Sequence, residues 1–366
     1  MSDPVARYIM IGGFLGAGKT TAMARLARRL TDQGHRVGLI CNDQSRGLVD
    51  TTLLRARGFS VEEITGGCFC CRFNSLLEAA EHLTQASRPD IFLAEPVGSC
   101  TDLVATVSYP LRRIYGDHFS VAPLSVLVDP TRAARILGLA EGRSFSETVT
   151  YVYRKQLEEA DLIVVNKCDA HPPVFLERLA SAVEQAFPQA RTLVCSGKDG
   201  TGFDAWLEAV AAGDPARSPS LVIDYDIYSD GEARLGWLNC TVQLESSRPF
   251  DGNQTLVRLA RHIRDHVAET GQEIAHLKMT LDSRDGSGTL SVVSLVGSDL
   301  EPDLRESLLD RLDRGELVIN LRAEADPTVL ETVTRAALAS LDGVHATMEH
   351  LEQLRPARPT PTHRMP

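Results

Sequence analysis

The chain has 366 residues, of which 43% are hydrophobic and 24% charged, a length and balance that predict a soluble protein of two or three domains. Its formal net charge of −11 argues against a nucleic-acid binder that acts by broad phosphate neutralisation. No apolar run approaches the length that crosses a bilayer, and no secretory signal is visible before the first apolar run. We therefore expect a cytoplasmic protein with no membrane partner and no nucleic-acid partner.

The first part of the chain, residues 1–212, alternates short apolar runs with helical patterns. Most runs are continuous and rich in Ile, Val and Leu, as in strands buried on both faces of a mainly parallel sheet. Strands are expected at 8–11, 36–41, 91–94, 124–128, 162–165 and 191–195, and helices at 21–31, 75–85, 151–159 and 174–186. Repeated βα units predict an α/β domain with a doubly wound sheet, whose ligands bind at the carboxyl ends of the strands.

A change of composition separates this part from the rest. Residues 213–222 contain two prolines, a glycine and small polar residues, which indicates a linker. Beyond it, strands are expected at 237–244, 274–281, 289–296 and 316–321, helices at 256–267, 304–312 and 329–341, and a hairpin turn at 285–288. The order βαββαβ, followed by a last helix, predicts a smaller α+β domain of ferredoxin-like type over residues 223–345. The Pro-rich tail, 346–366, is expected to be partly disordered.

The first motif is GGFLGAGKTT, which follows an apolar strand and opens a helical run. This arrangement is a P-loop, whose backbone N–H groups surround a phosphate. Lys19 should reach the β- and γ-phosphates as a catalytic residue, and the Thr20 hydroxyl should bind Mg²⁺. An ordinary turn between a strand and a helix is the alternative. The residues expected to bind nucleotide here are Gly13, Gly16, Ala17, Gly18, Lys19, Thr20 and Thr21.

The second motif, NKCD at residues 166–169, directly follows an expected strand. A carboxylate at Asp169 can accept hydrogen bonds from the N1–H and N2–H₂ edge of guanine, a donor pair that adenine lacks, so the motif favours GTP. Asn166 would hold the loop and contact the base, while the Lys167 stem would cover the ring. Ser196 stands where a further base-contacting loop is expected. A plain polar turn is the alternative at both places.

The third motif, EPVG at residues 95–98, follows the expected strand 91–94. An acidic residue at the end of a buried strand can hold Mg²⁺ directly or through water, and we predict this catalytic role for Glu95. The Gly98 N–H can approach a γ-phosphate closely, which would make the loop respond to the nucleotide. The alternative is a glutamate that caps the next helix.

The fourth motif is GGCFCC at residues 66–71, which gathers three of the eight cysteines. Cys68, Cys70 and Cys71 can converge on one soft cation, and the first two are too close in sequence for an unstrained disulfide. Because a fourth ligand is not obvious, the set suits a transferable metal better than a closed structural zinc. Buried small residues behind the P-loop are the alternative. Cys100 is a candidate extra ligand, and core positions are expected for Cys41, Cys168, Cys195 and Cys240.

Together the motifs resemble the CobW-like family of P-loop GTPases, proposed metal chaperones and metallocentre insertases. The resemblance is carried by GGFLGAGKTT, by the CxCC core of GGCFCC, by EPVG and by QLEEADLIVVNKCD at 156–169, and it covers roughly residues 7–212. Asn42-Asp43 resembles the family's Asn-Glu pair in the first switch region, which implies that Asp43 contributes to Mg²⁺ or metal binding. The His-rich tract that many members carry before the C-terminal domain is missing from this sequence.

The resemblance implies hydrolysis of GTP to GDP and phosphate, coupled to transition-metal binding at the CxCC motif and to delivery into a client metalloprotein. The implied cofactors are GTP and Mg²⁺, and the metal is zinc by default, with cobalt, iron and nickel as alternatives. The client would dock mainly through the C-terminal domain, and a nucleotide-dependent homodimer is a further expectation. The rival functions are a GTP-dependent assembly or activation factor that carries no metal, and a P-loop kinase. No glutamine stands where some GTPases position the attacking water, which predicts slow intrinsic hydrolysis.

Overall fold

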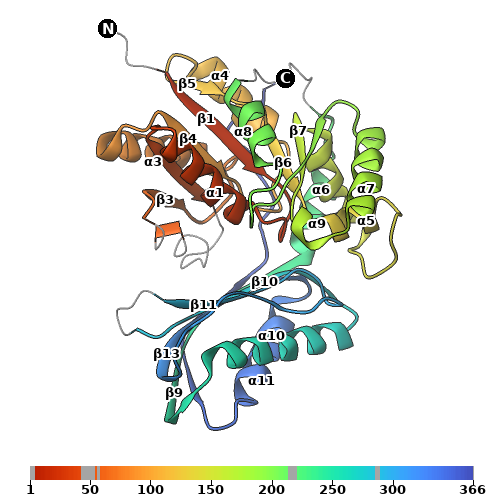
Figure 1. Cartoon of the computed structure of the whole chain (residues 1–366). Helices are drawn as coiled ribbons and strands as arrows, with labels where there is room; N and C mark the ends of the chain where they lie inside the picture. Colours follow the sequence, from red (N-terminus) through yellow and green to blue (C-terminus); the bar gives the residue numbers. More distant parts are fainter. Residues whose placement is uncertain (1–4, 43–53, 56–57, 213–220, 285–288, 366) are drawn as a thin grey trace.

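The computed structural model describes residues 5–42, 54–55, 58–212, 221–284 and 289–365. They form two units, one built on a parallel sheet and one on an antiparallel sheet (Figure 1). The predicted Mg²⁺ residue Asp43, most of the predicted linker (213–220) and the predicted turn at 285–288 lie outside the described residues. Among the helices that are described, none is both long and apolar enough to cross a membrane.

The first unit is built on an eight-stranded sheet in the order β3-β2-β4-β1-β6-β7-β8, with β5 paired to β1. Every pairing in it is parallel. The parallel doubly wound sheet is therefore confirmed. The strands are β1 (Ala6–Gly12), β2 (Val37–Asn42), β3 (Val61–Ile64), β4 (Ile91–Glu95), β5 (Phe119–Val121), β6 (Ser125–Val128), β7 (Leu162–Val165) and β8 (Arg191–Val194).

Helices cover both faces of this sheet. They are α1 (Lys19–Asp32), α3 (Phe73–Ser87), α4 (Tyr109–Ile114), α5 (Pro130–Ile136), α6 (Glu147–Glu158), α7 (Pro173–Ala186) and α8 (Phe203–Ala212). Alternate residues of β1 belong to different cores, because successive strand side chains point to opposite faces. Tyr8 and Met10 join the core that contains α3, α6 and α7, while Ile9 and Ile11 join the core that contains α1 and α8.

Two strands of the sheet were not predicted. The edge strand β3 carries Glu62 and Glu63 between two apolar residues, so it lacks the continuous apolar run of a strand buried on both faces. The strand β5 has only three residues. Short or half-polar strands leave little periodic signal in the sequence, and pairing with a longer neighbour defines them.

A further helix, α9 (Tyr225–Arg234), packs against α6 of the first unit. The approach is close, because a Cβ added to Gly231 would lie 2.5 Å from the backbone oxygen of Thr148. Tyr228 and Glu232 of α9 are buried. The expected C-terminal domain begins at residue 223, but in the structure this helix packs with the first unit.

The second unit is a six-stranded antiparallel sheet in the order β12-β11-β10-β13-β9-β14. Its strands are β9 (Leu235–Phe250), β10 (Glu273–Asp282), β11 (Leu290–Leu295), β12 (Asp303–Glu306), β13 (Leu312–Glu324) and β14 (His345–Leu354). Helices α10 (Gly252–Glu269) and α11 (Pro327–Ala339) cover the face that is turned away from the first unit (Figure 1). The α+β class predicted for this unit is confirmed.

The ferredoxin-like core uses other strands than expected. The order βαββαβ is formed by β9, α10, β10, β13, α11 and β14, while β11 and β12 extend the sheet beyond β10. The predicted helix at 304–312 is wrong, because β12 pairs antiparallel with β11 there. The helix-like spacing of its leucines is overridden by this pairing. The segment 345–354, most of which was expected to belong to a partly disordered tail, forms β14 and pairs with β9.

Arg132 of α5 joins the two units. Its guanidinium donates hydrogen bonds to the backbone oxygens of Ala275 (3.0 Å) and Val296 (2.7 Å) in the second unit, and to that of Leu15 in the P-loop. Arg132 is buried. Asp129, the N-cap residue of α5, accepts from the Arg132 backbone N–H at 3.0 Å. The second sheet is therefore held against the P-loop end of the first unit.

Candidate functional site

The P-loop lies between the end of β1 and the start of α1. Lys19 and Thr20 are the first two residues of α1 and are buried, and the loop glycines Gly13, Gly16 and Gly18 all have positive φ. The helix N-terminus and the curled backbone thus face the same space, an arrangement that suits a phosphate. The sequence prediction of a strand, a glycine-rich loop and a helix is met by the geometry.

Glu95, the last residue of β4, reaches the same point from the neighbouring strand. The Thr20 hydroxyl donates to the Glu95 carboxylate at 3.0 and 3.2 Å, and the Lys19 ammonium lies 3.7 Å from it. A hydroxyl and a carboxylate that converge in this way are hard oxygen ligands, which fit Mg²⁺. The predicted alternative of a helix cap does not apply, because no helix begins directly after Glu95.

The loop after Glu95 packs directly on the P-loop. A Cβ added to Gly98 would lie 2.8 Å from Leu15 Cδ2 and 3.0 Å from the Leu15 nitrogen, so only glycine fits there. The Gln156 side chain donates to the backbone oxygens of Gly98 (3.0 Å) and Cys100 (2.8 Å) and fixes the course of the loop. A displacement of Leu15 in the P-loop would therefore also displace residues 95–100.

The NKCD motif holds the other end of the site. Asn166 donates from Nδ2 to the Ala17 oxygen at 2.8 Å and accepts at Oδ1 from the Gly197 N–H at 2.9 Å. The Ser196 hydroxyl donates to the Asp169 carboxylate at 2.6 Å. Asn166 therefore ties the P-loop to the loop after β8, and Ser196 orients the carboxylate that is predicted to read guanine.

Lys167, predicted to cover the guanine ring, also links the P-loop to α5, which the sequence did not predict. Its ammonium donates to the Gly16 oxygen at 2.7 Å and to the Asp129 carboxylate at 2.8 Å. Burial works against the charged form of Asp129, yet the cations of Lys167 and Arg132 hold the pKa of Asp129 below its usual range. The sequence does carry a signal for this aspartate. Asp129-Pro130 directly follows an apolar run, which predicts a helix N-cap at the carboxyl end of a strand.

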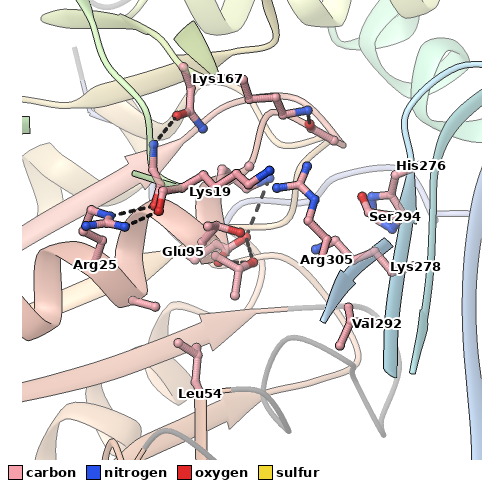
Figure 2. A pocket seen from close by; sticks show the side chains of 18 of the residues that line it. Lys19, Arg25, Leu54, Glu95, Lys167, His276, Lys278, Val292, Ser294 and Arg305 are labelled. Atoms are coloured by element: carbon pink, nitrogen blue, oxygen red, sulfur yellow. Dashed lines mark hydrogen bonds and ion pairs between the residues drawn. The ribbon is translucent and has the colours of Figure 1, made fainter. Parts of the chain in front are cut away.

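A cavity of about 550 Å³ lies between these elements (Figure 2). The predicted residues that line it are Gly16, Gly18, Lys19, Thr20, Thr21, Glu95, Gly98, Asn166, Lys167 and Asp169. The predicted residues Gly13, Ala17 and Ser196 do not line it. The second unit supplies the opposite wall with His276, Lys278, Val292, Val293, Ser294, Asp303, Arg305 and Glu306. No residue of that wall was predicted from the sequence.

The three clustered cysteines lie in the loop between β3 and α3. Their Sγ atoms are 2.7 Å (Cys68–Cys70), 3.3 Å (Cys68–Cys71) and 3.7 Å (Cys70–Cys71) apart, and all lie within 4.8 Å of one another. Cys68 and Cys70 are buried, and Cys71 is half-buried. Three soft ligand atoms on one short loop can bind one transition-metal ion. Cys68 and Cys70 also belong to the hydrophobic core of the first unit, as the alternative of buried small residues expects.

Cys100 reaches this cluster from the loop after Glu95. Hydrogen bonds from Cys100, then from Cys70 and Cys71, hold the pKa of Cys68 well below its usual value, whereas burial raises that of Cys100. The sulfur atoms of the two loops thus interact directly. The predicted extra ligand is therefore close to the cluster. Of the cysteines expected in the core, Cys41, Cys195 and Cys240 are buried and Cys168 is half-buried.

Residues 356–365, which we name the C-terminal strap, cross the cysteine loop. The Thr362 N–H donates to the Cys70 oxygen at 2.8 Å, and the Thr360 N–H donates to Cys71 Sγ at 3.2 Å. Arg364 at the end of the strap pairs with Asp102 at 2.7 Å. Backbone donors of this Pro-rich segment, part of the tail that was expected to be partly disordered, find partners on the first unit.

The family model for the CobW/HypB/UreG nucleotide-binding domain matches residues 7–194, just over half of the chain. The chain belongs to the CobW/HypB/UreG family. This family is a group of GTPases involved in metal handling. The match spans the P-loop, the cysteine loop, the Glu95 loop and the NKCD motif, and it ends at the last residue of β8.

Three solved structures illustrate what the chain is similar to. The hydrogenase maturation factor HypB from Archaeoglobus fulgidus is 22% identical, with 56% of this chain and 88% of that chain covered and a TM-score of 0.38. HypB from Helicobacter pylori in complex with nickel is 19% identical, with coverage of 56% and 85% and a TM-score of 0.41. Zn(II)-bound YjiA GTPase from E. coli is 16% identical, with coverage of 92% and 99% and a TM-score of 0.37.

Proposed function

We propose that this member of the CobW/HypB/UreG family binds and hydrolyses GTP and couples its nucleotide state to a transition-metal ion at Cys68, Cys70 and Cys71. The observation that carries this proposal is the six-residue loop from Glu95 to Cys100. Its first residue hydrogen-bonds the P-loop threonine, and its last lies against Cys68. A nucleotide that moves one end of such a short loop also moves the other, because its middle is packed on Leu15.

In the nucleotide half of the proposal, Lys19 and the P-loop backbone bind the β- and γ-phosphates. Thr20 and Glu95 hold Mg²⁺, and when bound this ion neutralises charge on the phosphates. Asp169, oriented by Ser196, accepts from the N1–H and N2–H₂ groups of guanine. The carbonyl of guanine at position 6 and the amine of adenine distinguish the two bases at the same edge, so GTP is the favoured nucleotide.

In the metal half, the ion is cargo rather than a resident cofactor. Thiolate ligands suit zinc first, with cobalt, iron and nickel as further candidates. Cys71 is the half-buried member of the set and offers the route by which an ion leaves. The protein would pass the ion to a client metalloprotein that docks mainly on the second unit, and two copies would associate when GTP is bound.

The test is a zinc titration against a chromophoric chelator, with Mg²⁺ and either GDP or a non-hydrolysable GTP analogue. We expect zinc affinities that differ by about five- to 150-fold between the two nucleotides, the usual range of allosteric coupling. Cys70→Ser should remove the difference, and Cys240→Ser, a buried cysteine of β9 remote from the loop, is the matched control. Equal zinc affinity in all states would favour the rival, an assembly or activation factor that carries no metal. Phosphate release that requires an added acceptor would instead favour a kinase.

A further inference from the structure

The wall that the second unit gives to the nucleotide cavity comes largely from β11 and β12. These strands are the extension of the ferredoxin-like core, and β12 is an edge strand of the sheet. Two basic side chains of this wall, Lys278 of β10 and Arg305 of β12, line the same cavity as Lys19 and Glu95. Figure 2 shows Arg305 extending from the second unit into the cavity, toward the end of Lys19.

The wall is fixed at the phosphate end of the cavity. A Cβ added to Gly16 of the P-loop would lie 2.8 Å from Val296 Cγ1 and 3.0 Å from the Ala275 oxygen. Arg132 bonds the backbones of Leu15, Ala275 and Val296 together, as described above. The P-loop and the second sheet are thus in direct contact, so the distance from Arg305 to the phosphate site is set by packed backbone.

Arg305 is itself held and aimed. Its Nε lies 2.7 Å from the Asp303 carboxylate on the same strand, and its side chain is only 25% exposed. Its positive charge acts on Lys167 in the same cavity: burial lowers the pKa of Lys167 most, and repulsion by Arg305 lowers it further. A cation that is oriented by a neighbour and turned into a phosphate cavity needs little reorganisation to meet a developing negative charge.

We propose that Arg305 is an arginine finger supplied in cis by the second unit. In hydrolysis, a water oxygen bonds to the γ-phosphorus while the bond from this phosphorus to the β–γ bridging oxygen breaks, which gives GDP and phosphate. Negative charge builds on the γ-phosphoryl oxygens and on the bridging oxygen. The guanidinium donates to these oxygens and stays charged, and the proton of the water ends on the released phosphate.

This inference rests on the proposed GTP hydrolysis and adds a residue to it. Hydrolysis would then depend on contact between the two units, because the P-loop and Arg305 come from different units. Arginine suits the role better than Lys278, since its planar fork can donate to two oxygens at once. Arginine fingers are worth about 10³–10⁵ in the rate of hydrolysis.

The test compares the full chain with Arg305→Ala and Arg305→Lys in single-turnover GTP hydrolysis without added zinc. We expect a rate at least about 100-fold lower in both variants, with GTP affinity changed less than about threefold, because the interaction forms mainly in the transition state. Affinity for GDP with aluminium fluoride, a transition-state mimic, should fall in parallel with the rate. Free guanidinium should restore part of the rate of Arg305→Ala. Arg335→Ala, an exposed arginine of α11, is the control.

Two results would overturn the role of Arg305. One is a rate within about threefold of the unaltered chain, well short of what an arginine finger supplies. The other is an equal loss of affinity for GTP and for GDP with aluminium fluoride, which would make Arg305 a ground-state or structural contact. If the unaltered chain itself releases no phosphate, the proposed GTPase function fails instead. The two failures are therefore distinguishable.

Discussion

Replacing Arg132 by methionine should separate the two units. The side chain is 7% exposed and makes hydrogen bonds of 3.0 and 2.7 Å to Ala275 and Val296, besides the one to Leu15. At about 1.5–3 kcal/mol for each hydrogen bond to a charged group, the first two alone contribute about 3–6 kcal/mol. Removing one member of a buried charged network typically costs about 3–5 kcal/mol, which is a consistent estimate. Methionine preserves the volume, so the loss reports the polar contacts.

Differential scanning calorimetry measures this effect. A loss of about 3–5 kcal/mol corresponds to a fall in Tm of roughly 6–20 °C, at about 2–4 °C per kcal/mol for a domain of 150–250 residues. We also expect one transition for the unaltered chain and two for the variant, because the second unit of the variant no longer unfolds together with the P-loop. Arg335→Met, on the exposed face of α11, should change the Tm by little more than 1 °C or so. A loss below about 1 kcal/mol with one transition retained would refute the reasoning, since it would mean that the carbonyls find other donors at no cost.

Two further predictions concern the first unit. Asp169→Asn should lower GTP affinity at least about 100-fold, because two hydrogen bonds to a carboxylate are lost. The variant should instead favour xanthosine triphosphate, because its carbonyl oxygen at position 2 can accept a hydrogen bond from the new amide. Nucleotide displacement would measure this, and an unchanged preference for GTP over ATP would exclude Asp169 as the base reader. Burial raises the pKa of Glu159 from 4.5 to about 8, so the folded chain keeps a proton that the unfolded chain releases in this range. The free energy of unfolding should therefore fall as the pH rises from about 4.5 to 8, which urea unfolding at several pH values would measure. Glu159→Gln should remove this pH dependence. Glu158→Gln, which replaces a partly exposed side chain, should retain it.

The nucleotide site was largely predictable because its parts are local. The P-loop, EPVG and NKCD are each contiguous, and each stands at the carboxyl end of a buried strand. The rule that ligands bind at those ends then brings them together without any knowledge of side-chain packing. Gly98 illustrates the limit of this reasoning, since its contact with Leu15 depends on the distance between two loops.

The second wall of the cavity was not predictable in the same way. The segment 304–312 has leucines at helical spacing, and only its pairing with β11 makes the part around Arg305 a strand. Nothing in the local sequence says that this strand will face a P-loop almost 300 residues earlier. Composition likewise indicated disorder for 356–365, because proline-rich polar segments lack the apolar area that folding needs. Hydrogen bonds to Cys70 and Cys71 supply the missing partners.

The C-terminal strap also sets an order of events during synthesis. The hydrogen bond from Thr360 to Cys71 joins residues that are 289 positions apart. At about 5–20 residues per second, the ribosome needs roughly 15–60 s to make the residues between them. During that time the cysteine loop can already fold with its neighbours, but its cover does not yet exist. Metal ions and oxidants can therefore reach the newly made thiols without crossing the C-terminal strap. Once residues 356–365 have been made and have docked, the strap covers the cysteine loop.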